Sequence, residues 1–84
     1  MEDIKKVKEE LEKIENFKNI NMSYNESKNI YDVYVKIRKD EEEVKEIFNE
    51  IENLEYEYCD YGIFEFYFVP ENADEVIAEL QEKF

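Results

Sequence analysis

Histidine and tryptophan are absent from this sequence, and cysteine, glycine and proline occur once each. Without His, and with a single Cys, the chain has no nitrogen and sulfur ligand set for a zinc site and no internal disulfide. The shortage of Gly and Pro excludes collagen-like and low-complexity chains. The protein must therefore hold its fold together with its own hydrophobic core.

Motifs for catalysis and for cofactor binding are equally scarce. The sequence has no Gly-rich phosphate loop and no Ca²⁺-binding loop with a central Gly. We therefore expect no metal, no cofactor and no enzymatic activity, because a catalytic site needs several groups in defined roles. We expect Cys59 to be an unreactive strand residue, since the acidic neighbours Glu57 and Asp60 would raise the pKa of its thiol.

Long apolar runs are also missing. No segment approaches the roughly 20 apolar residues of a membrane span, and the N-terminal MEDIKK has no apolar stretch typical of a signal peptide. We expect a cytoplasmic protein without membrane contact. A length of 84 residues is that of one domain, so the sequence predicts a single domain over residues 1–84.

The first half of the chain reads as a helix followed by two strands. Apolar residues at three- and four-residue spacing predict a helix over 3–17, with Phe17 closing its buried side. Alternation of apolar and polar residues predicts strands over 20–25 and 30–38. The four residues between them are polar, so the two strands should form an antiparallel hairpin.

Two further helices have recognisable starts. Asp40, with Glu43 three residues later, has the capping-box pattern, and it precedes an apolar stripe that predicts a helix over 41–53. Asn72, with Glu75 three residues later, repeats this pattern before the last helix. Both helices therefore begin at a residue whose side chain can accept backbone hydrogen bonds.

Strands are predicted over 54–59 and 63–69, joined by a turn in which Gly62 can take a positive φ. The order is α-ββ-α-ββ-α, which predicts a single two-layer α+β sandwich with a four-stranded, mostly antiparallel sheet and helices mainly on one face. The crossover through the middle helix should make strands 30–38 and 54–59 parallel, giving a mixed sheet. The face without helices should show Tyr34, Lys36, Glu55, Glu57, Glu65 and Tyr67.

Charge is the most unusual property of this sequence. The formal net charge is −13. Residues 1–45 carry twelve acids and ten bases, whereas residues 46–84 carry twelve acids and only one base, Lys83. Repulsion of this kind destabilises a compact state, and solubility needs a net charge of only about 2–8 for a small domain.

Two explanations of the excess charge stay open. The acids can be a solvated surface without a specific role, which is the usual fate of a charge run. Alternatively, they form a surface that binds a basic partner, because rows of carboxylates resemble the charge line of a nucleic-acid backbone. Tyr side chains between the acids could stack on Arg. The predicted partner-binding residues are Glu55, Glu57, Tyr58, Asp60, Tyr61, Glu65, Glu71, Asp74, Glu75 and Glu79.

The small size, the acidity, the lack of catalytic residues and the Glu/Tyr segment LEYEYCDYG together resemble a known class of protein. This class comprises small acidic phage-encoded inhibitors that mimic nucleic acid and block restriction or CRISPR effectors. The resemblance implies a non-catalytic inhibitor in the host cytoplasm. Its partner would be a basic nucleic-acid-binding protein, such as a CRISPR effector or another defence nuclease. Direct nucleic-acid binding is not expected, because the charge of −13 repels phosphates.

The aromatic segment 63–69 supports an alternative function. It is apolar on both faces, as in a strand that is central in its sheet or that a partner covers. The protein would then be a structural or regulatory homodimer whose two sheets pair through this strand.

Overall fold

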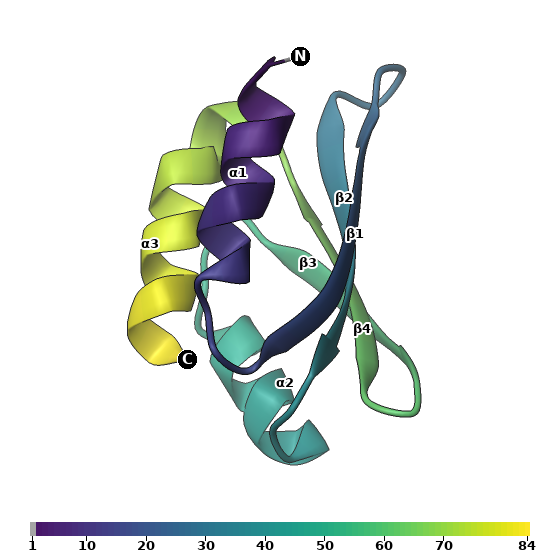
Figure 1. Ribbon diagram of the computed structural model, residues 1–84, viewed down its shortest axis with the longest axis vertical. Coiled ribbons are helices and arrows are strands. Elements are labelled where there is room, and N and C mark those ends of the chain that lie inside the picture. Colours follow the sequence, from purple (N-terminus) through teal and green to yellow (C-terminus); the bar gives the residue numbers. More distant parts are fainter. Residues whose placement is uncertain (1) are drawn as a thin grey trace.

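The computed structural model of the protein describes residues 2–84 and confirms the predicted α-ββ-α-ββ-α order (Figure 1). Two β-hairpins alternate with three helices. The elements are α1 (Glu2–Glu12), β1 (Phe17–Asn25), β2 (Ile30–Ile37), α2 (Glu41–Asn49), β3 (Glu55–Asp60), β4 (Ile63–Phe68), the short 3₁₀ helix η1 (Pro70–Asn72) and α3 (Ala73–Lys83).

The four strands form one sheet in the order β1-β2-β4-β3, and every pair of neighbours is antiparallel. The predicted mixed sheet is therefore wrong. Strands β2 and β3 do point the same way, but β4 lies between them and hydrogen-bonds to both. The reason is that β4 is the most apolar strand, and a central position covers both of its edges.

The first helix is shorter than predicted because the N–H groups of Lys13 and Ile14 bond three residues back, and the strand that follows contains a bulge. The helix ends at Glu12, and Phe17 begins β1 instead of closing the helix. The register shifts between Lys18 and Asn21, where Asn19 has a φ of 55°, a conformation that Asn tolerates better than most residues. The extra residue lets both Phe17 and Ile20 turn toward the helices despite their odd spacing.

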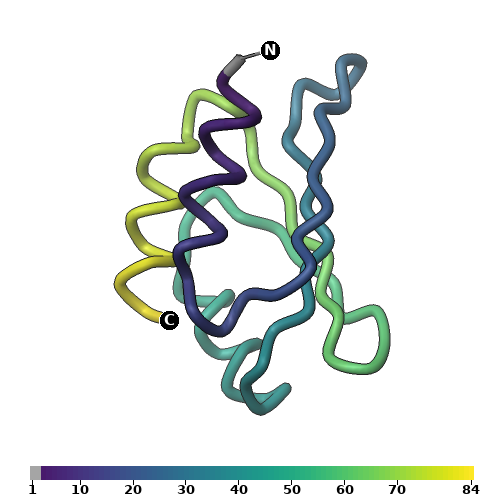
Figure 2. Tube along the Cα trace, viewed as in Figure 1, coloured from purple at the N-terminus to yellow at the C-terminus, as the bar shows by residue number. Residues whose placement is uncertain are grey.

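All three helices lie on the same side of the sheet (Figure 1). The chain trace shows α1 and α3 running side by side in the same direction (Figure 2). The core between the two layers is rich in aromatic rings, and Phe48 of α2 lies at its centre. Its ring centroid is 5.4 Å from that of Phe66, 5.6 Å from Phe64 and 5.7 Å from Phe84. These separations are those of favourable tilted and edge-to-face pairs.

The second helix confirms its predicted start but not its predicted end. One Asp40 carboxylate oxygen accepts hydrogen bonds from the backbone N–H of Glu42 and Glu43. The helix stops at Asn49, because the following N–H groups bond three residues back, from Glu50 to Ile47 and from Ile51 to Phe48.

Asn72 occupies the N-cap position of α3, but its side chain makes no capping hydrogen bond. The predicted cap is wrong in this respect. The turn η1 precedes the helix directly, and the Asn72 N–H bonds back to the carbonyl of Val69. Asp40 and Asn72 therefore share the capping-box pattern in the sequence, but only the Asp40 side chain caps its helix.

This difference can be measured. We expect Asp40→Ala to lower the free energy of unfolding by about 1 kcal/mol, because two N–H groups lose their acceptor. We expect Asn72→Ala to have a clearly smaller effect, since its side chain caps nothing. Urea denaturation of both variants tests this. Equal losses would contradict the capping role of Asp40.

Candidate functional site

The face of the sheet that the helices leave uncovered carries every second side chain of each strand. We call it the open sheet face. Asp32, Glu65 and Tyr67 on the two central strands are half-buried because neighbouring side chains flank them, and the other residues of this face are exposed. Its residues are Lys18, Asn21 and Ser23 of β1, Asp32, Tyr34 and Lys36 of β2, Ile63, Glu65 and Tyr67 of β4, and Glu55, Glu57 and Cys59 of β3.

One part of this face contains four carboxylates on three adjacent strands, Asp32, Glu55, Glu57 and Glu65, and we call it the acidic patch. Glu57 lies directly opposite Glu65, a pairing of like charges that destabilises a sheet. Asp32 pairs with Tyr67, which pairs in turn with Glu55. The strand order thus gathers acids that are 33 positions apart in the sequence, from residue 32 to residue 65.

Glu65 is the most perturbed acid of the acidic patch. Partial burial raises the pKa of Glu65, and the neighbouring Asp32 raises it further, while the Tyr34 hydroxyl acts in the opposite direction. Oxygen Oδ1 of Asp32 is buried and has no hydrogen-bond partner among the described residues. Glu65 and Asp32 therefore share a half-buried site in which burial and the repulsion from Asp32 disfavour the charged form of Glu65.

Within residues 3–84, no lysine or arginine forms a salt bridge with these acids. The salt bridges within residues 3–84 join Lys13 to Glu10, Lys45 to Glu41 and Glu42, and Lys83 to Glu50, all away from the open sheet face. The two bases on the face, Lys18 and Lys36, lie opposite each other on β1 and β2. The acidic patch is therefore uncompensated in the part of the chain that the structure describes.

The β3–β4 hairpin places Asp60 and Tyr61 beside the open sheet face. Tyr61 and Gly62 form a two-residue loop with φ values of 51° and 80°, and positive φ at both positions is the requirement of a type I′ turn. The Asp60 side chain accepts a hydrogen bond from the Tyr61 N–H at 3.0 Å. Tyr61 is 82% exposed. Packing of its ring therefore does little to offset the strain of its positive φ.

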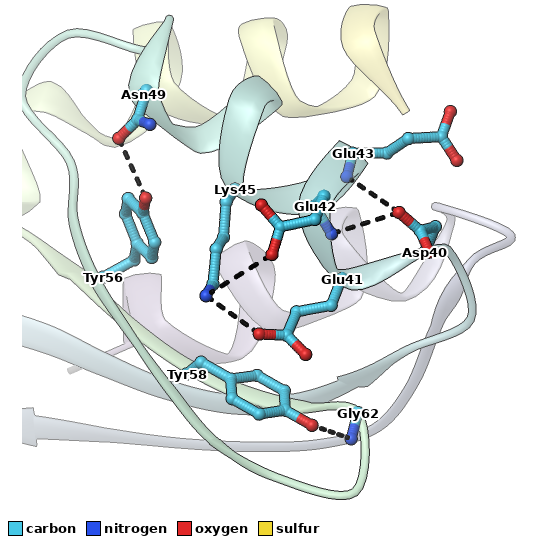
Figure 3. Close-up of polar contacts among 9 residues, drawn as sticks. All are labelled: Asp40, Glu41, Glu42, Glu43, Lys45, Asn49, Tyr56, Tyr58 and Gly62. Carbon is cyan, nitrogen blue, oxygen red and sulfur yellow. Dashed lines mark hydrogen bonds and ion pairs between the residues drawn. The ribbon is translucent and has the colours of Figure 1, made fainter.

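Tyr58 does not lie on the open sheet face, although it was predicted to contact a partner. Figure 3 shows Tyr56 pointing from β3 toward Asn49 of α2, whereas the Tyr58 ring lies near Lys45 of α2 with its hydroxyl directed at Gly62. The Tyr58 hydroxyl accepts a hydrogen bond from the Gly62 N–H at 3.2 Å, and the Lys45 ammonium lies 5.6 Å from the ring centroid. The Tyr56 hydroxyl donates to Asn49 Oδ1 at 2.9 Å. Tyr56 therefore fastens β3 to α2, while Tyr58 fixes the turn of its own hairpin and contacts α2 through Lys45.

The predicted contacts on the last helix lie in the other layer. Glu71 belongs to η1, and Asp74, Glu75 and Glu79 belong to α3, which covers the opposite face of the sheet (Figure 1). The ten predicted residues thus separate into a strand group with the hairpin tip, a helical group, and the inward-facing Tyr58. They do not form one surface.

Sequence reasoning missed Asp32 as a member of the site. Its alternation with Val33 already indicated an outward direction, but only the pairing of β2 with β4 brings it beside Glu65. The predicted rise in the pKa of the Cys59 thiol is confirmed, but its causes are burial first and then Glu65 and Glu57, so that Glu65 takes the place predicted for Asp60. Cys59 is exposed, and its thiol is free rather than part of a disulfide.

The strand proposed for pairing between two copies is central in the sheet. Both edges of β4 are hydrogen-bonded, and Phe64, Phe66 and Phe68 are buried in the core. Only its outer side chains remain for a second copy, and stacking through them would bring acidic patches together. The structure therefore offers less surface for this homodimer than the sequence indicated.

Among the described residues, no helix has the length and apolarity to cross a membrane. The same residues contain no group of three Cys, Asp or Glu side chains placed to hold a metal ion. Comparison of the chain with protein-family models, curated proteins and solved structures finds no match.

The raised pKa of Glu65 predicts that removing the charge of this side chain stabilises the protein, and that the effect depends on pH. Its pKa in the folded protein is above the ordinary value of 4.5, so its contribution to stability is largest below that value and is lost as pH rises through the raised pKa. We expect Glu65→Gln to raise the melting temperature at pH 7.5 more than the control Glu75→Gln, which removes the same charge from α3. The difference should shrink toward pH 4. A gain that does not change with pH would contradict this prediction.

The strained turn predicts a stabilising substitution. Asn adopts positive φ more readily than Tyr, so Tyr61→Asn should increase the free energy of unfolding by roughly 0.5–1 kcal/mol. Tyr61→Ala removes the ring but keeps the strain, and it should give no such gain. Chemical denaturation of the two variants distinguishes backbone strain from loss of the exposed ring.

Proposed function

We propose that this protein is a non-catalytic inhibitor that occupies the basic nucleic-acid-binding groove of a partner protein. The acidic patch of the open sheet face is the contact surface. The partner belongs to the class that the sequence resemblance indicates, a CRISPR effector or another defence nuclease of the host cytoplasm.

The observation that carries this proposal is the uncompensated acidic patch. Residues two apart on one strand, such as Glu55 and Glu57, lie about 6.6 Å apart on one face, and neighbouring strands add carboxylates about 4.8 Å to the side. This array offers closely spaced negative charges on a rigid sheet. A groove lined with Lys and Arg to hold phosphates would attract it over long range.

Tyrosine rings near the acidic patch add stacking contacts to its charge. Tyr34 is 44% exposed and lies opposite Glu65 on the neighbouring strand. Tyr61 projects from the hairpin tip at the end of the same sheet. An Arg that pairs with a carboxylate can also stack on a tyrosine ring, and Tyr and Arg are common interface anchors. Inhibition would then be steric and electrostatic competition with nucleic acid.

The test is competition between the protein and nucleic acid for one partner. The immobilised protein is exposed to a panel of purified nuclease effectors, with and without their guide RNA or DNA substrate. We expect it to retain at least one effector, to lose it when nucleic acid is added, and to bind more weakly as salt rises. Retention that nucleic acid does not reduce would contradict a shared groove.

Variants then locate the contact surface. Glu55→Gln combined with Glu57→Gln should weaken partner binding about tenfold, because two exposed ion pairs of up to about 1 kcal/mol each are lost. The matched control is Glu75→Gln combined with Glu79→Gln, which removes the same charge from α3. Equal weakening by both pairs would indicate general charge attraction and would contradict a role of the open sheet face.

A further inference from the structure

The sheet has two free edges, formed by β1 and β3. Within residues 3–84, the backbone groups of residues 18–25 and 55–60 make no backbone hydrogen bond beyond those to β2 and β4. Such an edge can pair with a strand of another molecule. The two edge strands run in opposite directions, because each strand is antiparallel to its neighbour. A second copy displaced sideways along the sheet therefore places its β1 antiparallel to β3 of the first copy.

The exposed side chains of the two edges correspond to each other on the open sheet face. The strand registers define three rows that cross the sheet from β1 to β3: Lys18, Lys36, Ile63 and Asp60; Asn21, Tyr34, Glu65 and Glu57; and Ser23, Asp32, Tyr67 and Glu55. Each row ends in a base or a neutral donor on β1 and in an acid on β3, and all these end residues are exposed. A neighbouring copy therefore offers each β3 carboxylate a hydrogen-bond donor.

Both edge strands contain a bulge at the same level of the sheet. The register of β1 shifts between Lys18 and Asn21, and that of β3 shifts between Tyr58 and Asp60. Each strand therefore carries one extra residue between the row that ends in Asp60 and the row that ends in Glu57. Because the extra residues match, β3 of one copy and β1 of the next stay in one antiparallel register over residues 55–60 and 18–23. A bulge in only one of the two strands would break this register.

The side of the two edge strands that faces the helices adds apolar pairs. In the same register, Tyr56 lies opposite Met22 of the neighbouring copy, and Tyr58 lies opposite its Ile20. All four side chains are half-buried and pack against the margin of the core, so each keeps some apolar surface for a neighbour. Residues directly opposite in antiparallel strands have Cβ atoms about 4.5–5.5 Å apart, and Met and aromatic side chains form favourable contacts at such distances.

We propose that copies of this chain associate head to tail, with β3 of one copy paired to β1 of the next in a continuous antiparallel sheet. Pairing of two β3 edges would place Glu55 and Glu57 of both copies side by side, and pairing of two β1 edges would leave Asn21 and Ser23 without an acid. Only the unlike edges are complementary in charge. A contact between unlike surfaces repeats from copy to copy instead of closing at a dimer. It uses the edges of the sheet and leaves the acidic patch open.

The first test is the mass of the protein in solution. The paired segments are much shorter than the roughly 20–30 residues a side of a stable interface, so association should be weak and depend on concentration. Sedimentation equilibrium measures it at about 0.15 M salt, where repulsion between the net charges is screened beyond about 8 Å. We expect the average mass to rise with concentration past that of a dimer. A protein that stays monomeric, or whose mass stops at the dimer, would overturn the proposal.

Charge exchange then identifies the two edges. Asn21→Glu places an acid opposite Glu57 of the next copy and should weaken association about fivefold, the upper cost of a like-charge cross-strand pair. Adding Glu57→Lys to this variant should restore association, because the two substituted side chains form an ion pair across the contact.

The matched control adds Glu75→Lys on α3 to Asn21→Glu and gives the same net charge. It should not restore association, and circular dichroism shows whether each variant is folded. Equal recovery by both additions would mean general relief of repulsion. No recovery with Glu57→Lys would mean that β3 does not pair with β1. Either result overturns the proposal.

Discussion

The structure depends on burying the inner face of β4. Phe64, Phe66 and Phe68 all point into one core, where Phe48 of α2 contacts two of them. A strand with this apolar content is most stable in the centre of a sheet, covered by β2 and β3 at its edges and by the helices on one face. Because β4 follows β3 in the chain but lies beside β2, the second hairpin folds back onto the first, and this strand order determines which outward residues become neighbours.

The candidate site is a consequence of that core. Glu65 lies between Phe64 and Phe66 in the sequence, so burial of the two rings forces its carboxylate outward. There it lies opposite Glu57 and close to Asp32. The repulsion among these groups is tolerated because the aromatic core beneath them stabilises the sheet. A rigid core thus holds like charges together on a surface where free chains would separate them, which is what recognition by a basic groove requires.

The two layers of the molecule present different surfaces. The open sheet face is broad, and its acids lie on strands whose backbone hydrogen bonds keep them in register. The helical layer has a groove of about 570 Å³ between α1 and α3, lined in part by the buried apolar residues Val7, Ala73 and Ile77, which the sheet face lacks. The tyrosines divide between these surroundings: Tyr56 donates to Asn49 of α2, Tyr58 accepts from Gly62 in its own hairpin, Tyr31 lines the groove, and Tyr61 projects into solvent.

What the sequence by itself determined is local. Alternation predicted which residues of each strand point outward, Asp40 predicted the start of α2, and Gly62 predicted a tight turn, because each of these follows from a few neighbouring residues. Only the tertiary structure decided that β4 separates β2 from β3, that the β1 bulge turns Phe17 inward, and that the predicted acidic contacts divide between two layers. The position of Asp32 beside Glu65, and the groove above Tyr31, also arise from contacts between segments far apart in the chain. Periodicity tells which way a side chain points, but its neighbours depend on how distant segments share one core.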